Sequence, residues 1–138
     1  MTGFANKRIT EDNGAIPPDF GNGETTMFFI THHRSYNKYL EKNVEKIYKG
    51  DYLFIEHVDL IDQSDKYDDK DKYRYVFNYE YVNGGTSAVN PYRTTQEKEF
   101  YILDRKTNLV YKSPYSSASW SRVQKVYLKK LNKKMGKD

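Results

Sequence analysis

Residues 72–82 read Lys-Tyr-Arg-Tyr-Val-Phe-Asn-Tyr-Glu-Tyr-Val, and the interpretation of the whole chain depends on this stretch. Aromatic residues recur at every second position: Tyr73, Tyr75, Phe77, Tyr79 and Tyr81. An extended chain places alternate side chains on one face, and aromatic and β-branched residues favour strands. The pattern therefore predicts a β-strand with an aromatic face. That face either packs beneath helices, as large aromatic rows usually do, or forms a surface that stacks against a ligand.

The segment before this strand carries a strand–helix–strand pattern. Thr25–Thr31 is a short apolar run, which is typical of a strand covered on both faces. Ser35 is the predicted N-cap of a helix that runs to Tyr48, with Gly50 just beyond its end. A second strand is predicted over residues 51–61. The short connection favours a right-handed crossover between two parallel strands.

The segment after the aromatic strand predicts a hairpin. Residues 83–96 read as a loop of about a dozen residues, a length that is often functional. Residues 99–103 and 109–112 are two predicted strands that turn through residues 104–108. Asn108 is the residue expected to take a positive φ in that turn.

The end of the chain predicts one more helix. Ser113-Pro114 breaks the preceding strand, and one of three serines is the expected cap: Ser116, Ser117 or Ser119. The inner stripe of this helix is expected to consist of Trp120, Val123, Tyr127, Leu131 and Met135.

The resulting element order, β-α-β-β-β-β-α, predicts an α+β fold. We expect a two-layer sandwich in which a mostly antiparallel sheet of four or five strands carries both helices on one face. Residues 25–138 would form this single domain. Residues 1–24 lack a sustained period and contain several turn signals, so they are predicted to be a flexible leader. This leader serves either as a tether or as a segment anchored across the domain by Phe4, Ile9, Ile16 or Phe20.

Composition excludes several kinds of chemistry. The chain has no cysteine, which removes thiol catalysis and Cys-ligated metal sites. The net charge of +4 owes much to lysines after Arg122, whereas residues 59–71 are acidic. No apolar run approaches the roughly 18–20 residues of a membrane span. The first residues do not resemble a signal peptide, and a location outside the cytoplasm would require an export signal that has been removed.

Catalytic and metal-binding motifs are weak in this sequence. His32, His33 and His57 are the only histidines, and they are the candidates for a metal-dependent or hydrolytic site. They lack the spacing of a zinc motif and a cysteine partner. The acidic residues of the 59–71 segment offer oxygen ligands for calcium without the spacing of an EF-hand. No catalytic residue and no cofactor is therefore predicted.

The aromatic strand supplies the candidate ligand-binding residues, which are Tyr73, Tyr75, Tyr79, Tyr81, Arg74 and Arg93. Rings on an open sheet stack against bases or sugars, and nearby cations hold phosphates. The leading hypothesis is a small noncatalytic binding or structural accessory domain with a protein or polyanionic partner. Two alternatives stay open: nucleic-acid or polyanion binding through the aromatic sheet and the basic last helix, and an enzyme that uses the histidines.

Overall fold

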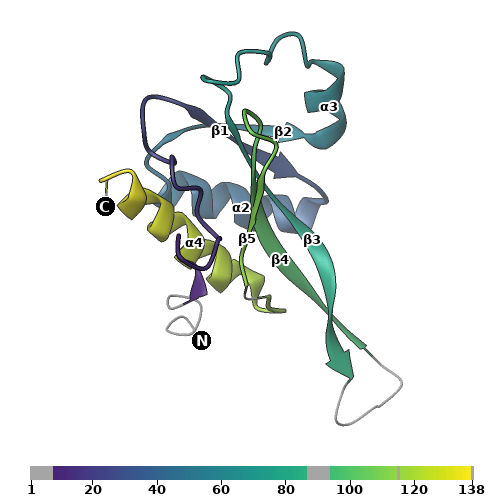
Figure 1. The fold of residues 1–138 in the computed structure, drawn as a ribbon. Helices are drawn as coiled ribbons and strands as arrows, with labels where there is room; N and C mark the ends of the chain where they lie inside the picture. The colour runs from purple at the N-terminus through teal and green to yellow at the C-terminus, as the bar shows by residue number, and fades with distance from the viewer. Residues whose placement is uncertain (1–7, 87–93, 115, 138) are drawn as a thin grey trace.

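The computed structural model describes residues 8–86, 94–114 and 116–137, and it has an α+β fold (Figure 1). The elements are β1 (Thr26–Thr31), α2 (Arg34–Ile47), β2 (Asp51–Glu56), α3 (His57–Asp62), β3 (Tyr75–Thr86), β4 (Thr94–Asp104), β5 (Val110–Lys112) and α4 (Trp120–Lys134). The strands form one mixed sheet in the order β2-β1-β3-β4-β5. β1 runs parallel to both of its neighbours, whereas β3, β4 and β5 pair antiparallel and include the longest ladder. The predicted fold class is confirmed.

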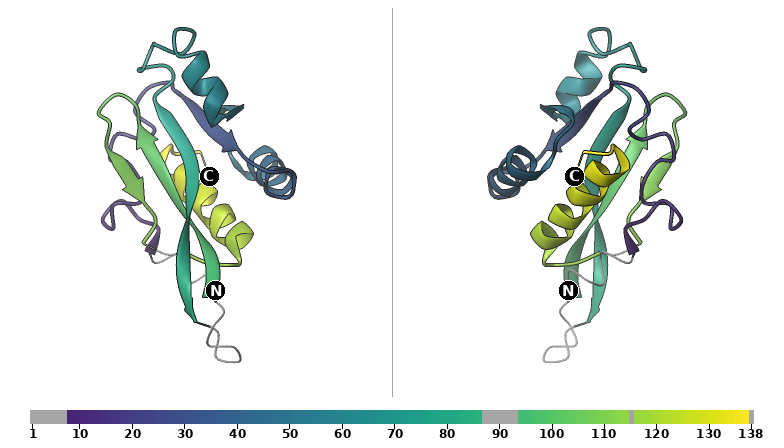
Figure 2. Two further views of the ribbon diagram at one scale, coloured as in Figure 1. Left: turned by 90° about the vertical axis from the view of Figure 1, so that its right-hand side faces the viewer. Right: turned by 90° about the vertical axis from the view of Figure 1, so that its left-hand side faces the viewer.

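The two long helices cover the same face of the sheet (Figure 2). Buried polar contacts join them: the Gln124 amide donates to the Tyr36 hydroxyl at 3.1 Å, and the Asn132 amide donates to the Ile47 carbonyl at 2.6 Å. The start of α4 therefore lies beside the start of α2, and their ends lie together as well. The helices run parallel, and both begin at the same end of the molecule.

The aromatic strand is present as β3, and its face lies mostly in the helix-covered core. Tyr75, Phe77 and Tyr79 are buried there, whereas Tyr81 is 51% exposed. Tyr73 precedes the strand, which begins at Tyr75, and packs instead against Phe28 on the opposite face. The alternation predicted from the sequence thus holds only from the first strand residue onward.

The opposite face of the sheet carries a second, smaller cluster. Phe28, Ile30 and Val76 are buried there together with Tyr67 from the loop after α3. Since β1 sends alternate side chains into both clusters, it is covered on both faces. This agrees with the prediction from its continuous apolar sequence.

The first helix begins two residues earlier than predicted. His33, not Ser35, is its N-cap: the His33 ring nitrogen Nδ1 accepts a hydrogen bond from the Tyr36 backbone N–H at 3.3 Å. The Ser35 hydroxyl contacts that same Nδ1 atom at 2.9 Å. An imidazole nitrogen is a hydrogen-bond acceptor in its unprotonated form and can serve as a cap in the way that a serine oxygen does.

The second strand is shorter than predicted, because the chain turns into α3 after Glu56. The neighbouring strand β1 ends at Thr31, which is the register partner of Glu56. Residues 57–61 therefore have no ladder partner, and the helix satisfies their backbone groups within the segment. The predicted strand over residues 51–61 is thus confirmed for residues 51–56 and wrong for residues 57–61.

The predicted hairpin is formed by β4 and β5, and Asn108 in its turn has a φ of 63°, as expected. The predicted 83–96 loop is shorter than expected, because β3 continues to Thr86 and β4 begins at Thr94. The middle of that loop lies outside the described residues. β3 and β4 together form an arm that extends beyond the other strands (Figure 1).

The last helix begins after Ser119, one of the three serines predicted as caps, although that side chain makes no capping hydrogen bond. Val123, Tyr127 and Leu131 of the predicted inner stripe are buried. Within the described ranges, no helix combines the length and the apolar character needed to cross a membrane.

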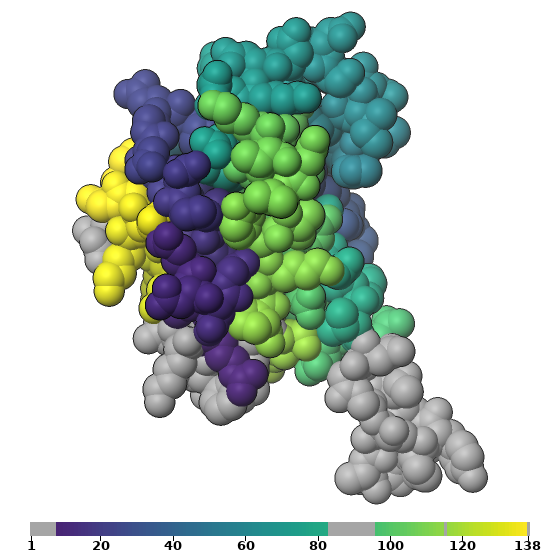
Figure 3. Space-filling model, viewed as in Figure 1, coloured from purple at the N-terminus to yellow at the C-terminus, as the bar shows by residue number. Residues whose placement is uncertain are grey.

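Residues 8–24 lie across the domain between α4 and β5 (Figure 3). Ile9, Ile16 and Phe20 are buried in the main core, and the Tyr127 hydroxyl donates to the Ala15 carbonyl. This arrangement matches the second form that the sequence allowed for the leader, in which apolar side chains anchor it. Phe4 lies outside the described residues.

Candidate binding site

Aromatic and cationic side chains gather where α2 and α4 begin beside the β3–β4 arm. The Lys98 ammonium lies over the rings of Tyr79, Tyr81 and Trp120, at 5.2, 5.0 and 5.2 Å from their centroids. A cation within about 6 Å of a ring centroid is attracted by the electron density of the ring face. His32 lies against the same group, with its ring centroid 4.4 Å from that of Tyr79. We call these five residues the aromatic–cation cluster.

The pairing of the strands places the cluster. Tyr81 and Lys98 are register partners across β3 and β4, so their side chains share the helix-covered face. β1 pairs with β3 only as far as Phe77, so the next aromatic positions extend beyond its end. Trp120 closes the group from the first turn of α4, with its ring 4.9 Å from that of Tyr36. Four separate parts of the chain thus meet at this point: β3, β4, the start of α4 and the end of β1, where His32 lies.

His32 is held in a defined orientation at the end of β1. Its Nε2 lies 2.6 Å from the Asn78 side-chain oxygen, and the Asn78 amide nitrogen contacts the Tyr101 hydroxyl at 3.1 Å. Because that oxygen can only accept, Nε2 carries the proton and Nδ1 is left as an acceptor in the neutral ring. Desolvation lowers the pKa of His32 below 6.5. The hydrogen bond to Asn78 partly offsets this by raising the pKa, while the charges of His33, Lys98 and His57 lower it further.

Tyr79 of the cluster is held as a neutral phenol. Burial raises the pKa of Tyr79, and its contact with Tyr81 adds to the effect. Burial likewise raises the pKa of Tyr36, which lies next to Tyr79 in the core. Tyr79 and Tyr36 therefore contribute neutral rings beside the Lys98 ammonium.

Part of the cluster is accessible to a ligand. Tyr81 is 51% exposed, and Tyr39, whose ring lies 5.7 Å from that of Trp120, is 48% exposed. Tyr79 is buried and supports the exposed rings from beneath. Exposed rings fixed by a rigid sheet and helix can stack against a planar group at a low cost in conformational entropy.

The two faces of the arm differ in charge. On the cluster face, Lys98 has no carboxylate within ion-pair distance among the described residues. The alternate positions carry Glu80, Glu97 and Glu99 on the opposite face, where Lys112 pairs with Glu80 at 2.6 Å. The alternation of the strands thus separates the glutamates from the exposed rings.

The helix ends add to the positive character of the cluster face. α2 and α4 both begin here, and neither has an acidic residue in its first turn. The N-terminus of a helix carries a partial positive charge that favours anions. A shallow hollow at the start of α2 is lined by His33, Arg34, Ser35 and Lys38.

The residues predicted to bind a ligand do not gather in one place. Tyr79 and Tyr81 belong to the cluster, although Tyr79 is buried. Tyr75 lies deep in the core beside Phe20, and Tyr73 lies on the opposite face of the sheet. Arg93 lies outside the described residues.

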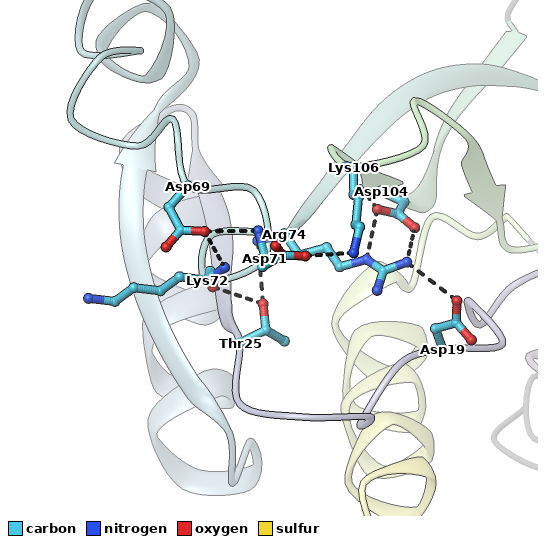
Figure 4. A network of polar contacts seen from close by, with 8 residues as sticks. All are labelled: Asp19, Thr25, Asp69, Asp71, Lys72, Arg74, Asp104 and Lys106. Atoms are coloured by element: carbon cyan, nitrogen blue, oxygen red, sulfur yellow. Dashed lines mark hydrogen bonds and ion pairs between the residues drawn. The ribbon is translucent and has the colours of Figure 1, made fainter.

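Arg74 belongs to an ion-pair network at the start of β3 (Figure 4). Its guanidinium makes two hydrogen bonds to Asp104, at 3.0 and 2.9 Å, and reaches Asp19 at 3.5 Å. The Asp104 side chain is only 2% exposed; burial alone would raise its pKa, but the Arg74 and backbone hydrogen bonds hold that pKa below its usual value. This bidentate geometry joins the start of β3 to the end of β4 and engages Arg74 within the fold, and the longer Asp19 contact reaches the segment of residues 8–24.

The histidines do not form a joint site. His33 caps α2, His57 is the first residue of α3, and only His32 lies in the cluster. In the part of the chain that the structure describes, no three histidine or acidic side chains come together in a way that could hold a metal ion. In the acidic loop, Asp69 accepts backbone hydrogen bonds and Asp71 pairs with Lys106 at 2.6 Å.

Sequence reasoning missed Lys98, Trp120 and Asn78 as site residues. Lys98 could have been found from the alternation with Phe100 and Ile102, which places it on the apolar face of its strand. Trp120 was predicted as a core residue of the last helix, and its position at the helix start leaves it partly exposed. Asn78 gives no local signal, since its partner His32 is 46 residues away.

Comparison with known proteins identifies no relative: no protein-family model matches the chain, and no curated protein or solved structure shows significant similarity to it. The functional argument therefore depends on the geometry of the site.

Proposed function

We propose that this protein is a noncatalytic binding domain and that its ligand occupies the aromatic–cation cluster. The observation that carries the proposal is the position of Lys98 among three rings, without a carboxylate partner among the described residues, at a place where Tyr81 is half exposed. A lysine that only serves solubility needs no such surroundings. Here the rings orient the ammonium at a surface that a ligand can reach.

The chemistry of the cluster favours a ligand with a planar ring next to a negative charge. The rings of Tyr81 and Tyr39 offer stacking surfaces, and Lys98 with the two helix starts offers positive charge. Stacking of a base on an aromatic side chain contributes roughly 1–3 kcal/mol and tolerates any base. Single-stranded nucleic acid combines both features and is the ligand class that we propose.

A second candidate function uses α4 alone. Its exposed side carries Arg122, Lys125, Lys129 and Lys133, and the helix contains no acidic residue. Such a row binds a sulfated glycan or any other polyanion through charge, without stacking. An enzyme based on the three histidines has no comparable support, since His33 caps a helix and His57 starts another.

The test is a thermal-shift titration with a twelve-residue oligothymidine and with heparin, at low and moderate salt. The oligothymidine is expected to raise the melting temperature of the wild type, with an effect that decreases as salt increases. In the Lys98→Gln variant this rise should be lost. The matched control is Lys112→Gln, which removes an exposed lysine on the other face of the same hairpin and should respond like the wild type.

The outcomes separate the candidates. If heparin raises the melting temperatures of both variants and the wild type by the same amount while the oligothymidine raises none of them, the α4 surface is the binding site. If neither probe changes any melting temperature, the proposed ligand class is wrong.

A further inference from the structure

The edge of the sheet formed by β2 has an unusual character. β2 is the outer strand of the β2-β1 pair, and its six residues pair with β1 without a bulge. No backbone hydrogen bond to Asp51–Glu56 from outside the sheet occurs among the described residues. Alternate N–H and C=O groups of an edge strand point away from the sheet and can pair with another strand.

The two edges of the sheet differ in how they are protected. β5 is only three residues long, ends in Lys112 and is followed by Pro114, and residues 8–24 lie alongside it (Figure 3). Short edge strands, lysine and proline all hinder pairing with a further strand. β2 contains none of these features. It reads Asp-Tyr-Leu-Phe-Ile-Glu, a regular strand of β-favouring residues.

Apolar side chains beside this edge are exposed to solvent. Leu53 is 40% exposed and lies on the same side of the sheet as α3, since its register partner Phe28 belongs to the cluster on that side. Val58 and Ile61 on α3 are 54% and 59% exposed and, three residues apart, share one face of that helix. Of the seven large apolar side chains that are exposed among the described residues, three thus fall within nine residues. This concentration separates the β2 edge from ordinary surface.

The charge at this edge is acidic, whereas the net charge of the whole chain is positive. Residues 51–65 contain five acidic residues (Asp51, Glu56, Asp59, Asp62 and Asp65) and no lysine or arginine, although the whole chain has a net charge of +4. Asp51 and Glu56 stand at the two ends of the strand. A second copy paired antiparallel through β2 would place these acids opposite each other, which opposes self-association.

We propose that β2 is a strand-addition site for an extended segment of another protein, with alternating apolar residues in its centre and lysine or arginine at its ends. The backbone of the incoming segment pairs with the free edge of β2, its apolar side chains contact Leu53 and the exposed face of α3, and its cations meet Asp51 and Glu56. Backbone pairing supplies affinity in such complexes, and alternate side chains supply specificity. This site is separate from the aromatic–cation cluster and does not depend on its ligand.

The experiment is a selection of random nine-residue peptides displayed on phage against the full chain, followed by binding measurements with the enriched peptide. Enriched peptides are expected to alternate apolar and polar residues between basic ends. Binding should protect the amides of residues 51–56 from hydrogen exchange and should weaken as salt increases. Methylation of alternate backbone nitrogens along one edge of the peptide should weaken binding about tenfold or more, because those N–H groups can no longer pair.

Variants of the protein complete the test. Leu53→Lys places a lysine on the edge and should weaken peptide binding about tenfold or more. Leu109→Lys is the matched control, since Leu109 is also exposed but lies in the β4–β5 turn, and it should bind like the wild type. The proposal is overturned if no peptide is enriched, if protection falls outside residues 51–62, or if both variants bind equally. A wild-type dimer that Leu53→Lys dissociates would show that the occupant is a second copy and would also overturn it.

Discussion

Lys98 and His32 both lie against the ring of Tyr79, but their surroundings have opposite effects on their charge. The rings attract the Lys98 ammonium, whereas desolvation and the neighbouring cations disfavour a proton on His32. The cluster thus holds one cation that contacts three rings and one neutral imidazole that is fixed by Asn78. An anionic ligand would reverse the balance at His32, because a negative charge nearby favours the imidazolium.

The lowered pKa of His32 predicts how stability depends on pH. The unfolded chain binds a proton at His32 more readily than the folded chain, so this contribution to stability is present above pH 6.5 and is lost as the pH falls through the lower folded value. We expect the free energy of unfolding, measured by urea denaturation, to decrease between pH 7 and 5. His32→Gln should flatten this decrease, and an NMR titration of the imidazole should give a pKa below 6.5. An unchanged slope in the variant would contradict the burial of this ring.

Some single residues were predictable from the sequence and others were not. Asn108 was identified because a positive φ in a hairpin turn selects for asparagine or glycine, a purely local constraint. The capping role of His33 was missed because serine is the more common cap and stood two positions later. Lys98 and Asn78 take their roles from partners far away in the sequence, which no local pattern reports.

Among the elements, the segment of residues 8–24 is stabilised by specific contacts with α4 and β3. The buried Tyr127 hydroxyl donates to the Ala15 carbonyl, and Phe20 packs against Tyr75 at 5.0 Å between ring centroids. Tyr75 is also buried, yet its own hydroxyl has no hydrogen-bond partner among the described residues. The two tyrosines therefore form a natural comparison.

Removal of each hydroxyl should have opposite effects on stability. Tyr127→Phe deletes a buried hydrogen bond and leaves the Ala15 carbonyl without its partner, so the free energy of unfolding should fall by about 1–2 kcal/mol. Tyr75→Phe deletes a buried hydroxyl that forms no hydrogen bond, so stability should stay constant or rise by up to about 1 kcal/mol. Urea denaturation of both variants measures the difference. A larger loss for Tyr75→Phe than for Tyr127→Phe would contradict the contacts described here.

At the level of elements, the sequence predicted those with a clear hydrophobic period. α2, β3, the β4–β5 hairpin and α4 occur where alternation or helical spacing indicated them, and β1 occurs where a continuous apolar run did. α3 was missed because Val58, Leu60 and Ile61 continue the apolar character of β2, and only the end of β1 at Thr31 decides where pairing stops. The end of β1 is set by the tertiary structure, so the local sequence of β2 and α3 does not show it.

For the whole molecule, the main result is a separation of surfaces. The aromatic–cation cluster and the basic side of α4 lie on the helix-covered side of the sheet. The acidic and apolar surface lies at the β2 edge, at the opposite end of the sheet from β5. The fold class and the positions of both long helices were predictable because amphipathic helices must cover an apolar sheet face. The candidate site was predictable only in part: Tyr79 and Tyr81 were named from the aromatic row, but the buried Tyr75 and the ion-paired Arg74 serve the fold.

The central claim is that a ligand stacks at the aromatic–cation cluster, and Trp120 allows a direct measurement. Trp120 is the only tryptophan of the chain and contacts Lys98 within the cluster, so its fluorescence reports on this site alone. We predict that a twelve-residue oligothymidine quenches this fluorescence to saturation at low salt, that the apparent affinity falls as salt increases, and that Lys98→Gln weakens it while Lys112→Gln does not. Fluorescence that stays constant throughout the titration, or quenching that both variants retain equally, would contradict the claim.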